Sequence, residues 1–221
     1  MIYELLPPTD PRVLTMIAPF DEKILKEEEK ISPKEFADNM FETMEKYGGI
    51  GLSANQVGKP YRMFVMGHPQ IEQGKKRVCY NPEIKGYSKE TIRFKEGCLT
   101  FPYLFLDVER PRAVAVKYLD ENMKEVEENL TGLSARVFQH EYDHMQGILF
   151  TEKVSKFKLQ WAMNKRDKSI NKARKMWQQT KWNGQQLKKS KTGETLAKWK
   201  DQMRYFGMAI EKFMTCGYQW S

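Results

Sequence analysis

The sequence predicts an α+β fold for roughly its first two thirds, on three observations. Runs of β-branched and aromatic residues follow one another in hairpin order, with turn residues rather than helices between them. Stretches with helical periodicity flank these runs. The region is about 150 residues long, which is enough to bury a sizeable core.

The first clear helix is predicted to begin after Ser32. Ser32 to Glu35 form a capping box, with proline at the first helical position. Apolar residues then recur at helical steps until Gly48 and Gly49, which end the run. In the loop that follows, glycines let the backbone approach a ligand closely, and Gln56 offers an amide donor. On its own, this loop is equally compatible with a plain turn.

Strands are predicted at residues 61–66 and 113–119. Both runs are rich in apolar and aromatic residues. A turn at residues 120–122 connects the second run to a more polar strand candidate at residues 124–130. Two strands joined by such a short turn form an antiparallel hairpin, which is the basis for placing the fold in the α+β class.

Residues 140–144 read His-Glu-Tyr-Asp-His, the pattern HExxH, and use two of the three histidines. On a helix both imidazoles lie on one face and can reach a single metal ion, with Glu141 placed to move protons on a metal-bound water. Apolar residues recur at steps of three to five from Leu133 to Met145, and Gly147 is a good helix stop. The pattern predicts a metal centre on a packed helix.

A catalytic metal site usually has three protein ligands, so a third one is needed. The metallopeptidase pattern HExxHxxGxxH matches as far as Gly147, but Phe150 stands where its third histidine would be. Because no histidine follows His144, the third ligand is expected upstream. Cys98 offers a soft thiolate suited to Zn or Fe(II), although a lone cysteine is also often an ordinary buried thiol.

Three blocks, in this order, resemble the peptide deformylase family: GIGLSANQ at residues 49–56, EGCLT at 96–100 and QHEYDH at 139–144. The family pattern is GxGLxAxQ, EGCLS and QHExDH. Ser53 replaces a common alanine, and Thr100 replaces serine but keeps a hydroxyl. The resemblance spans roughly residues 1–153, taken as the catalytic domain. It implies antiparallel sheets around a central helix that bears the HExxH pattern.

The resemblance implies one divalent metal ion per chain, bound by Cys98, His140 and His144. Fe(II) is the ion expected in vivo, and Zn, Ni or Co are expected to be able to substitute for it. Glu96 is expected beside these ligands, paired with Arg110.

The resemblance also implies a reaction, the hydrolytic removal of the N-formyl group from the N-terminal methionine of nascent polypeptides, with release of formate. Glu141 would take a proton from the metal-bound water and pass it to the leaving amine. The side-chain amide of Gln56 and the backbone N–H of Leu99 would hold the oxyanion. The chain would then be a metal-dependent hydrolase that acts on a linear amide.

For the substrate, the resemblance implies binding of the peptide as an added strand at Gly51 and Gly97. Ile50 and Leu133 correspond to walls of the pocket for the methionine side chain. Arg136 stands where many relatives have an apolar residue, at the expected rim of that pocket.

Residues 154–221 are predicted to form a basic, mostly helical extension. From Ser155 to Ser221 there are 16 Lys and Arg against 4 Asp and Glu, a net charge of +12, whereas the residues before carry −4. Apolar periodicity predicts two amphipathic helices, over residues 159–177 and 196–213. Two roles stay open for the extension: packing within the protein with its lysines solvated, or binding to ribosomal RNA through phosphates.

Two other functions are also considered. A metallopeptidase that cleaves internal amide bonds is disfavoured by Phe150, and an RNA-binding protein with a structural metal site is disfavoured by Glu141, since such a site needs no base. No apolar run is long enough to span a membrane. Three cysteines, an odd number with one needed as a reduced ligand, favour the cytoplasm.

Overall fold

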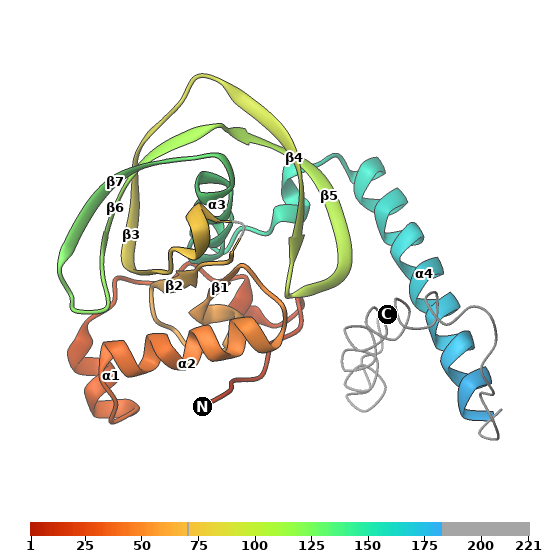
Figure 1. The fold of residues 1–221 in the computed structure, drawn as a ribbon, viewed down its shortest axis with the longest axis horizontal. Helices are drawn as coiled ribbons and strands as arrows, with labels where there is room; N and C mark the ends of the chain where they lie inside the picture. Colours follow the sequence, from red (N-terminus) through yellow and green to blue (C-terminus); the bar gives the residue numbers. More distant parts are fainter. Residues whose placement is uncertain (70, 183–221) are drawn as a thin grey trace. The chain divides into compact units, whose positions relative to one another are not determined.

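The computed structural model describes residues 1–69 and 71–182 (Figure 1). The chain divides into two units, the first formed by Met1–Ala162 and the second beginning at Met163. The predicted second helix of the extension, residues 196–213, lies outside the described residues. The α+β class is confirmed, because antiparallel sheets and separate helices make up the first unit.

Helices form where the sequence provides caps and apolar faces. Ser32 Oγ accepts a hydrogen bond from Glu35 N at 3.1 Å. This cap confirms that a helix, α2, begins after Ser32 as predicted. The helices are α1 (Glu22–Glu28), α2 (Pro33–Lys46), α3 (Gly132–Met145) and α4 (Lys156–Trp182), with 3-10 turns at Pro11–Val13, Ala54–Val57, Glu72–Gly74 and Phe150–Lys153. Among the described residues, no helix combines the length and the apolar character that a membrane crossing needs.

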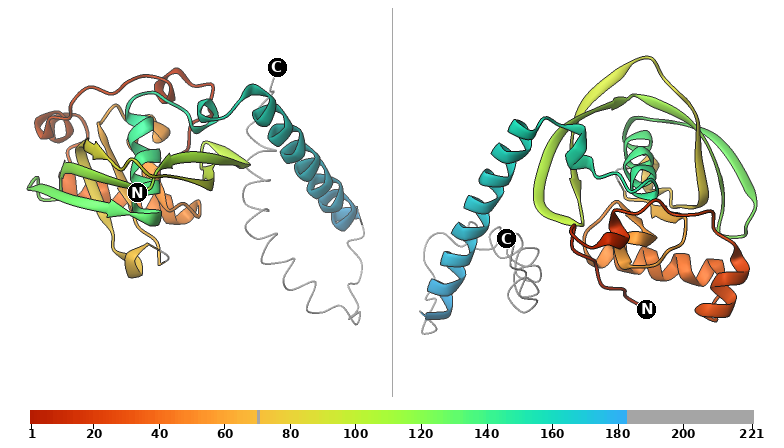
Figure 2. Two further views of the ribbon diagram at one scale, coloured as in Figure 1. Left: turned by 90° about the horizontal axis from the view of Figure 1, so that it is seen from above. Right: turned by 180° about the vertical axis from the view of Figure 1, so that it is seen from behind.

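The strands form two antiparallel sheets. Five strands pair in the order β1-β2-β3-β6-β7, and β4 pairs with β5 in a separate ladder. The strands are β1 (Gly51–Ser53), β2 (Met63–Met66), β3 (Arg77–Tyr87), β4 (Thr91–Cys98), β5 (Phe101–Pro111), β6 (Ala113–Leu119) and β7 (Glu125–Thr131). In Figures 1 and 2, α3 runs between the five-stranded sheet and the β4–β5 ladder.

The core has two parts that share strand β2. Because side chains alternate along a strand, Met63 and Val65 join the cluster around α2, whereas Phe64 and Met66 join the cluster around α3. Figure 1 shows β1 and β2 lying between the two helices. The HExxH helix is therefore packed by apolar side chains against the face of the five-stranded sheet that carries Phe64 and Met66, as its apolar periodicity predicts.

Strands β2, β6 and β7 lie where the sequence predicts them, within two residues. Strands β1, β3, β4 and β5 are not among the strands predicted from the sequence, and for β3 and β4 the reason is physical. β3 contains a proline and a glycine and has two register shifts against β6. The first five residues of β4 are all exposed, including Ile92 and Phe94, so the alternation of polar and apolar residues there does not mark a buried face.

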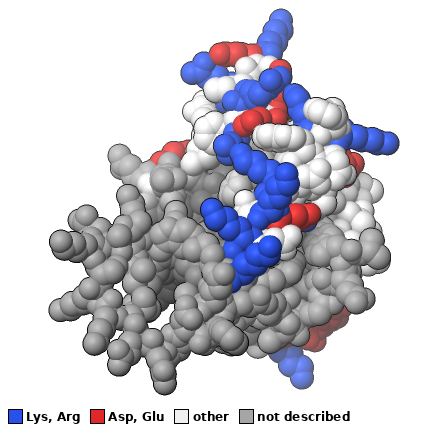
Figure 3. All heavy atoms as spheres, turned by 90° about the vertical axis from the view of Figure 1, so that its right-hand side faces the viewer, with Lys and Arg blue, Asp and Glu red and all other residues white. Residues whose placement is uncertain are grey.

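Helix α4 is strongly basic, as predicted for the start of the extension. It contains nine Lys and Arg and one Asp, a net charge of +8. Figure 3 shows lysine and arginine side chains following this helix. The exposed lysines with described side chains are Lys156, Lys158, Lys165, Lys168, Lys172 and Lys175.

Candidate active site

Helix α3 places the HExxH residues inside the protein. It begins at Gly132, whose φ of +58° is a left-handed conformation that glycine tolerates. Just beyond its end, Gly147 has φ +70°, and a Cβ there would lie 2.5 Å from the carbonyl oxygen of Leu14. Glycine is therefore required at this stop. His140, Glu141 and His144 are all buried on the helix between these glycines.

The structure brings His140, His144 and Cys98 together. One ligand atom from each lies within 4.8 Å of the other two. Cys98 stands at the end of β4, and its Sγ is 3.3 Å from His144 Nε2. The upstream thiol thus meets the two imidazoles, although 46 residues separate it from His144.

This cluster fits a divalent transition metal. His140 Nδ1 faces Glu96 Oε2 at 3.1 Å, an arrangement that orients the ring and leaves its Nε2 for an ion. Burial alone would raise the pKa of the Cys98 thiol, but the imidazoles of His144 and His140 lower that pKa well below its usual value. One thiolate and two imidazoles form a donor set that suits Zn(II) or Fe(II) and leaves a fourth position open. The chain has a metal-binding triad.

Glu141 lies beside the triad with an unsatisfied carboxylate oxygen. It is 4% exposed, and its Oε2 has no hydrogen-bond partner within the residues that the structure describes. Burial raises the pKa of Glu141 to about 7, against the lowering effect of His140 and His144. Gly51 makes room for this carboxylate, since a Cβ at Gly51 would collide with Glu141 Oε1 and lie 2.8 Å from Val137 Cγ1.

Gln56 is held in one orientation by its neighbours. Its Oε1 accepts hydrogen bonds from the backbone N and the Oγ of Ser53, both at 2.9 Å. Its Nε2 donates to Thr100 Oγ1 at 2.9 Å and lies 3.4 Å from Cys98 Sγ. Both departures from the family motif, Ser53 and Thr100, thus contact this one amide, and their hydroxyls aim its NH₂ group toward the triad.

The residues expected to bind substrate lie on or beside the elements around the triad. Gly51 lies in β1, an edge strand of the five-stranded sheet whose one partner there is β2. Ile50 and Leu133 are partly buried and pack on the cluster around α3. Gly97 pairs with Phe105, and a Cβ at Gly97 would lie 2.8 Å from the Phe105 ring. Leu99 follows Cys98 directly, and its side chain packs on the cluster around α2.

A buried ionic network supports the triad. Arg110 donates to both oxygens of Glu96, at 2.7 and 3.0 Å, which confirms their predicted pairing. Arg110 Nη1 also bonds Asp143 Oδ2 at 2.6 Å. Burial acts to raise the pKa of Glu96, but hydrogen bonds from His140 and Arg110 hold it below the usual range. No role for Asp143 is predicted from the sequence, although this aspartate is one of the residues that match the family pattern QHExDH.

Arg136, which the resemblance places near the rim of the methionine pocket, is a buried residue. Arg136 is 5% exposed, and its guanidinium turns inward to Glu96 Oε1 at 2.8 Å. The same group donates to two backbone carbonyl oxygens in β4 and β5. The physical reason is electrostatic: a buried guanidinium needs a carboxylate and several acceptors, and these lie on the inner side of the β4–β5 ladder.

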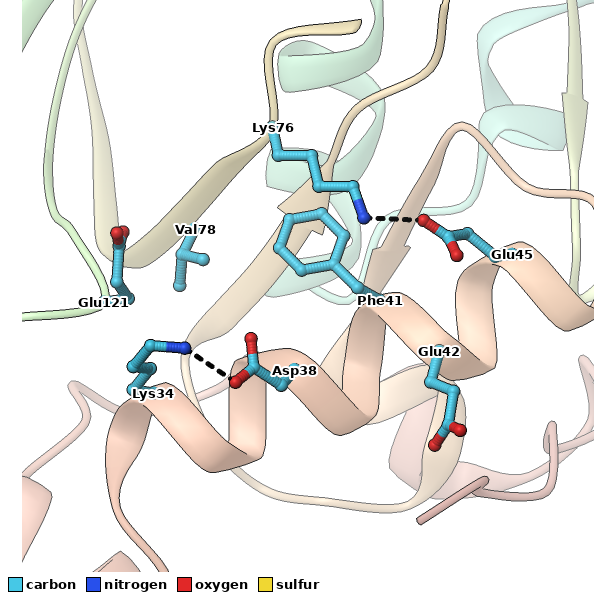
Figure 4. Close-up of a pocket in the computed structure, with 8 residues that line it drawn as sticks. All are labelled: Lys34, Asp38, Phe41, Glu42, Glu45, Lys76, Val78 and Glu121. Carbon is cyan, nitrogen blue, oxygen red and sulfur yellow. Dashed lines mark hydrogen bonds and ion pairs between the residues drawn. The ribbon is translucent and has the colours of Figure 1, made fainter.

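A separate hollow lies between α2 and the start of β3. Its volume is about 370 Å³, and Figure 4 shows Phe41 and Val78 at its floor with charged side chains around them. The charges are largely paired, as in Lys34–Asp38 at 2.8 Å and Lys76–Glu45 at 2.7 Å. None of the triad residues lines this hollow, so the chemistry belongs elsewhere.

Comparison with known proteins identifies the family of the chain. The profile of the family described as polypeptide deformylase matches residues 13–160. The chain belongs to the polypeptide deformylase family. A peptide deformylase from Pseudothermotoga lettingae is 49% identical over 116 residues, which cover 52% of this chain and 65% of that protein. One from Erythrobacter litoralis is 36% identical over 188 residues, covering 74% of this chain and 95% of that protein.

Solved structures support the same family. The crystal structure of a peptide deformylase from Thermotoga maritima has a TM-score of 0.60 and 37% identity, and covers 70% of this chain and 99% of that chain. Peptide deformylases are metal-dependent hydrolases that remove the formyl group from N-terminal methionine. Membership in the family therefore confirms the predicted class of enzyme and the predicted reaction.

Proposed function

We propose that the chain removes the N-formyl group from formylmethionyl peptides with Glu141 as its proton carrier. Cys98, His140 and His144 would hold one divalent ion, which when bound supplies an acidified water and polarises the formyl carbonyl. The ion is proposed to be Fe(II), with Zn, Ni or Co able to replace it. The observation that carries the proposal is the buried Oε2 of Glu141 beside the thiolate–imidazole triad, an atom with no hydrogen-bond partner among the described residues.

The proton path follows from Glu141. Its carboxylate takes a proton from the attacking water while the water oxygen bonds to the formyl carbon. As the carbon–nitrogen bond breaks, Glu141 returns this proton to the leaving amine, so that formate and a free N-terminus are the products. A carboxyl group with a pKa near neutral can both accept a proton from the water and donate it to the leaving amine. Burial is the main cause of the raised pKa of Glu141.

Two donors are proposed to stabilise the charge on the formyl oxygen. One is the Gln56 amide, whose orientation is fixed by Ser53 and Thr100. The other is the backbone N–H of Leu99, next to Cys98. Such donors act strongly in a buried site because they need no reorganisation when the charge develops.

The peptide is proposed to bind as an added strand along the free edge of β1 at Gly51, with Gly97 opposite. Ile50 and Leu133 would contact the methionine side chain. This activity is proposed for the cytoplasm, because a thiolate ligand and an odd number of cysteines suit a reducing compartment.

The test is release of formate from formyl-Met-Ala-Ser by full-length protein purified anaerobically with Fe(II), or with Ni(II). Turnover that a chelator abolishes and added metal restores is the expected result. Acetyl-Met-Ala-Ser, which carries an acetyl group in place of the formyl group, serves as the matched control and should release no acetate. A folded, metal-loaded protein without turnover would refute the proposal, and cleavage of internal peptide bonds would then be tested.

Replacing Gly51 with alanine is expected to lower formate release about 100-fold. The added methyl group would collide with Glu141 Oε1 and crowd Val137, so the base would leave its position. The assay is kcat with circular dichroism as a folding check. Gly86→Ala is the matched control, since a Cβ there meets only Ala115 at 3.9 Å. Near-native activity in Gly51→Ala would contradict this role for the glycine.

We further propose that the basic extension binds ribosomal RNA, beginning with helix α4. The net charge of +8 in this helix and its exposed lysines support contacts with phosphates. Such contacts would supply affinity without base specificity and would weaken as salt rises. The bound enzyme would then meet its substrate as nascent chains emerge from the ribosome.

Reversing the charge of three lysines in α4, Lys165, Lys168 and Lys172, is expected to weaken binding of the full chain to a ribosomal RNA fragment. Losing up to three phosphate contacts should flatten the slope of log affinity against log salt by about 2 to 3. Fluorescence anisotropy at several salt concentrations measures this. The matched control reverses the exposed lysines Lys23, Lys46 and Lys124. Equal losses in both triple variants would contradict a specific role for the extension.

A further inference from the structure

The three residues of the metal-binding triad come from two elements, a helix and a strand, that are far apart in the sequence. Helix α3 supplies His140 and His144, whereas Cys98 comes from β4. Among the described residues, β4 pairs only with β5 and shares no ladder with the five-stranded sheet. The position of the thiol relative to the imidazoles therefore depends on how α3 is fastened to the β4–β5 ladder.

Arg136 makes three of the hydrogen bonds that join α3 to the β4–β5 ladder. Its Nη1 donates to Glu96 Oε1 at 2.8 Å and to the Val108 carbonyl oxygen at 3.1 Å. Its Nη2 donates to the Ile92 carbonyl oxygen at 2.6 Å. Ile92 and Glu96 belong to β4, and Val108 belongs to β5, so one side chain ties the helix to both strands.

The bonds of Arg136 also complete the surroundings of the Glu96 carboxylate. Arg136 and Arg110 both donate to Oε1, at 2.8 and 2.7 Å. Oε2 faces Arg110 Nη2 at 3.0 Å and His140 Nδ1 at 3.1 Å. With partners on both oxygens, the carboxylate is fixed about its own axis, and the aim of the His140 ring is fixed with it.

Only an arginine can make this arrangement. The planar guanidinium presents several donors in a rigid fork, and Arg136 uses them on one carboxylate and two carbonyls. A lysine ammonium is a point charge on a flexible stem, and an apolar side chain has no donor at all. An apolar residue here would also leave the Val108 and Ile92 carbonyl oxygens without this donor.

We infer that Arg136 is a positioning residue for the metal centre, acting on His140 through Glu96 and on Cys98 through the anchoring of β4 to α3. The inference rests on the metal site of the proposed function. It concerns the placement of ligands, so its primary readouts are the affinity for a metal ion and the geometry of the ligands around that ion.

The decisive variant is Arg136→Met, which keeps much of the side-chain length and removes every donor. Its affinity for Co²⁺, measured by competition with a chelator on the purified full chain, is expected to fall about 10-fold. The thiolate-to-cobalt absorption band should also shift or weaken, because the geometry around Cys98 changes. Circular dichroism and thermal unfolding establish that the variant is folded.

Arg77→Met is the matched control. Arg77 is likewise buried, at 4% exposed, and it bonds two carboxylates, Glu72 and Glu128. Its loss should lower the unfolding temperature but leave the Co²⁺ affinity and absorption band native. If Arg136→Met binds Co²⁺ like the native chain, with an unchanged band, the inference is overturned.

A second variant covers the case in which Arg136→Met does not fold. Arg136→Lys keeps the charge opposite Glu96 but cannot span all three acceptors, so a few-fold loss of Co²⁺ affinity is expected. Native affinity in folded Arg136→Lys would then overturn the inference. If the native chain itself bound no Co²⁺, the metal site of the proposed function would be refuted. That outcome differs from a native Co²⁺ affinity in the Arg136 variants, which would refute only the role of Arg136.

Discussion

Glu141→Gln is expected to lower the rate of formate release by a factor of about 10² to 10⁴, the range for loss of a general acid–base group. Glutamine has nearly the same shape, so the close packing against Gly51 is kept. Its amide cannot accept the proton of the attacking water or return one to the leaving amine. The measurement is kcat for formyl-Met-Ala-Ser with metal content determined on the same sample.

This result is informative only if the metal is still bound. The Co²⁺ affinity of Glu141→Gln should stay close to native, since Glu141 is not one of the triad residues. Glu152→Gln is a matched control on a carboxylate outside the site, where Glu152 accepts from the backbone N–H of Leu149. Turnover of Glu141→Gln within a few-fold of native would remove Glu141 from the mechanism.

Cys98→Ala is expected to lower Co²⁺ affinity by more than about 100-fold, beyond the usual loss for a residue that only supports a ligand. The substitution removes one of three donor atoms, and its thiolate charge with it. Formate release should fall in parallel, and excess metal should restore little of it. Competition with a chelator measures the affinity, and loss of the thiolate-to-cobalt band identifies the missing ligand.

Cys79→Ala is the natural control for this variant. Cys79 is fully buried in β3, within the cluster around α3, and burial raises the pKa of its thiol well above the usual value. A protonated thiol in an apolar cluster is a poor metal ligand, so its loss should leave metal affinity native. A native band in Cys98→Ala that disappears in Cys79→Ala would reverse the assignment.

Much of this site is predictable from the sequence because its parts are local. The spacing of His140 and His144 fixes their relative position once the helix forms, and Gly132 and Gly147 bound that helix. The capping box at Ser32 predicts α2 in the same way. For Cys98, the choice of third ligand rests on the family resemblance, since the residues alone are also compatible with a buried thiol.

What the sequence does not predict depends on contacts between distant segments. Arg136 and Glu96 are 40 positions apart, and no periodicity relates a residue on α3 to an exposed strand such as β4. For the same reason, no local pattern indicates that the Arg136 side chain turns to the β4–β5 ladder, which supplies three acceptors on its inner side. Local pattern sets each element, and packing between elements decides where charged side chains point.

The sharing of β2 between two core clusters has a consequence for how the sequence can drift over evolutionary time. Changes in side-chain volume at Met63 or Val65 press on α2, which contributes no residue to the triad. Changes at Phe64 or Met66, one position along, press on the helix that bears His140 and His144. Neighbouring positions of one four-residue strand are therefore under unequal selection, and substitutions should accumulate with a period of two.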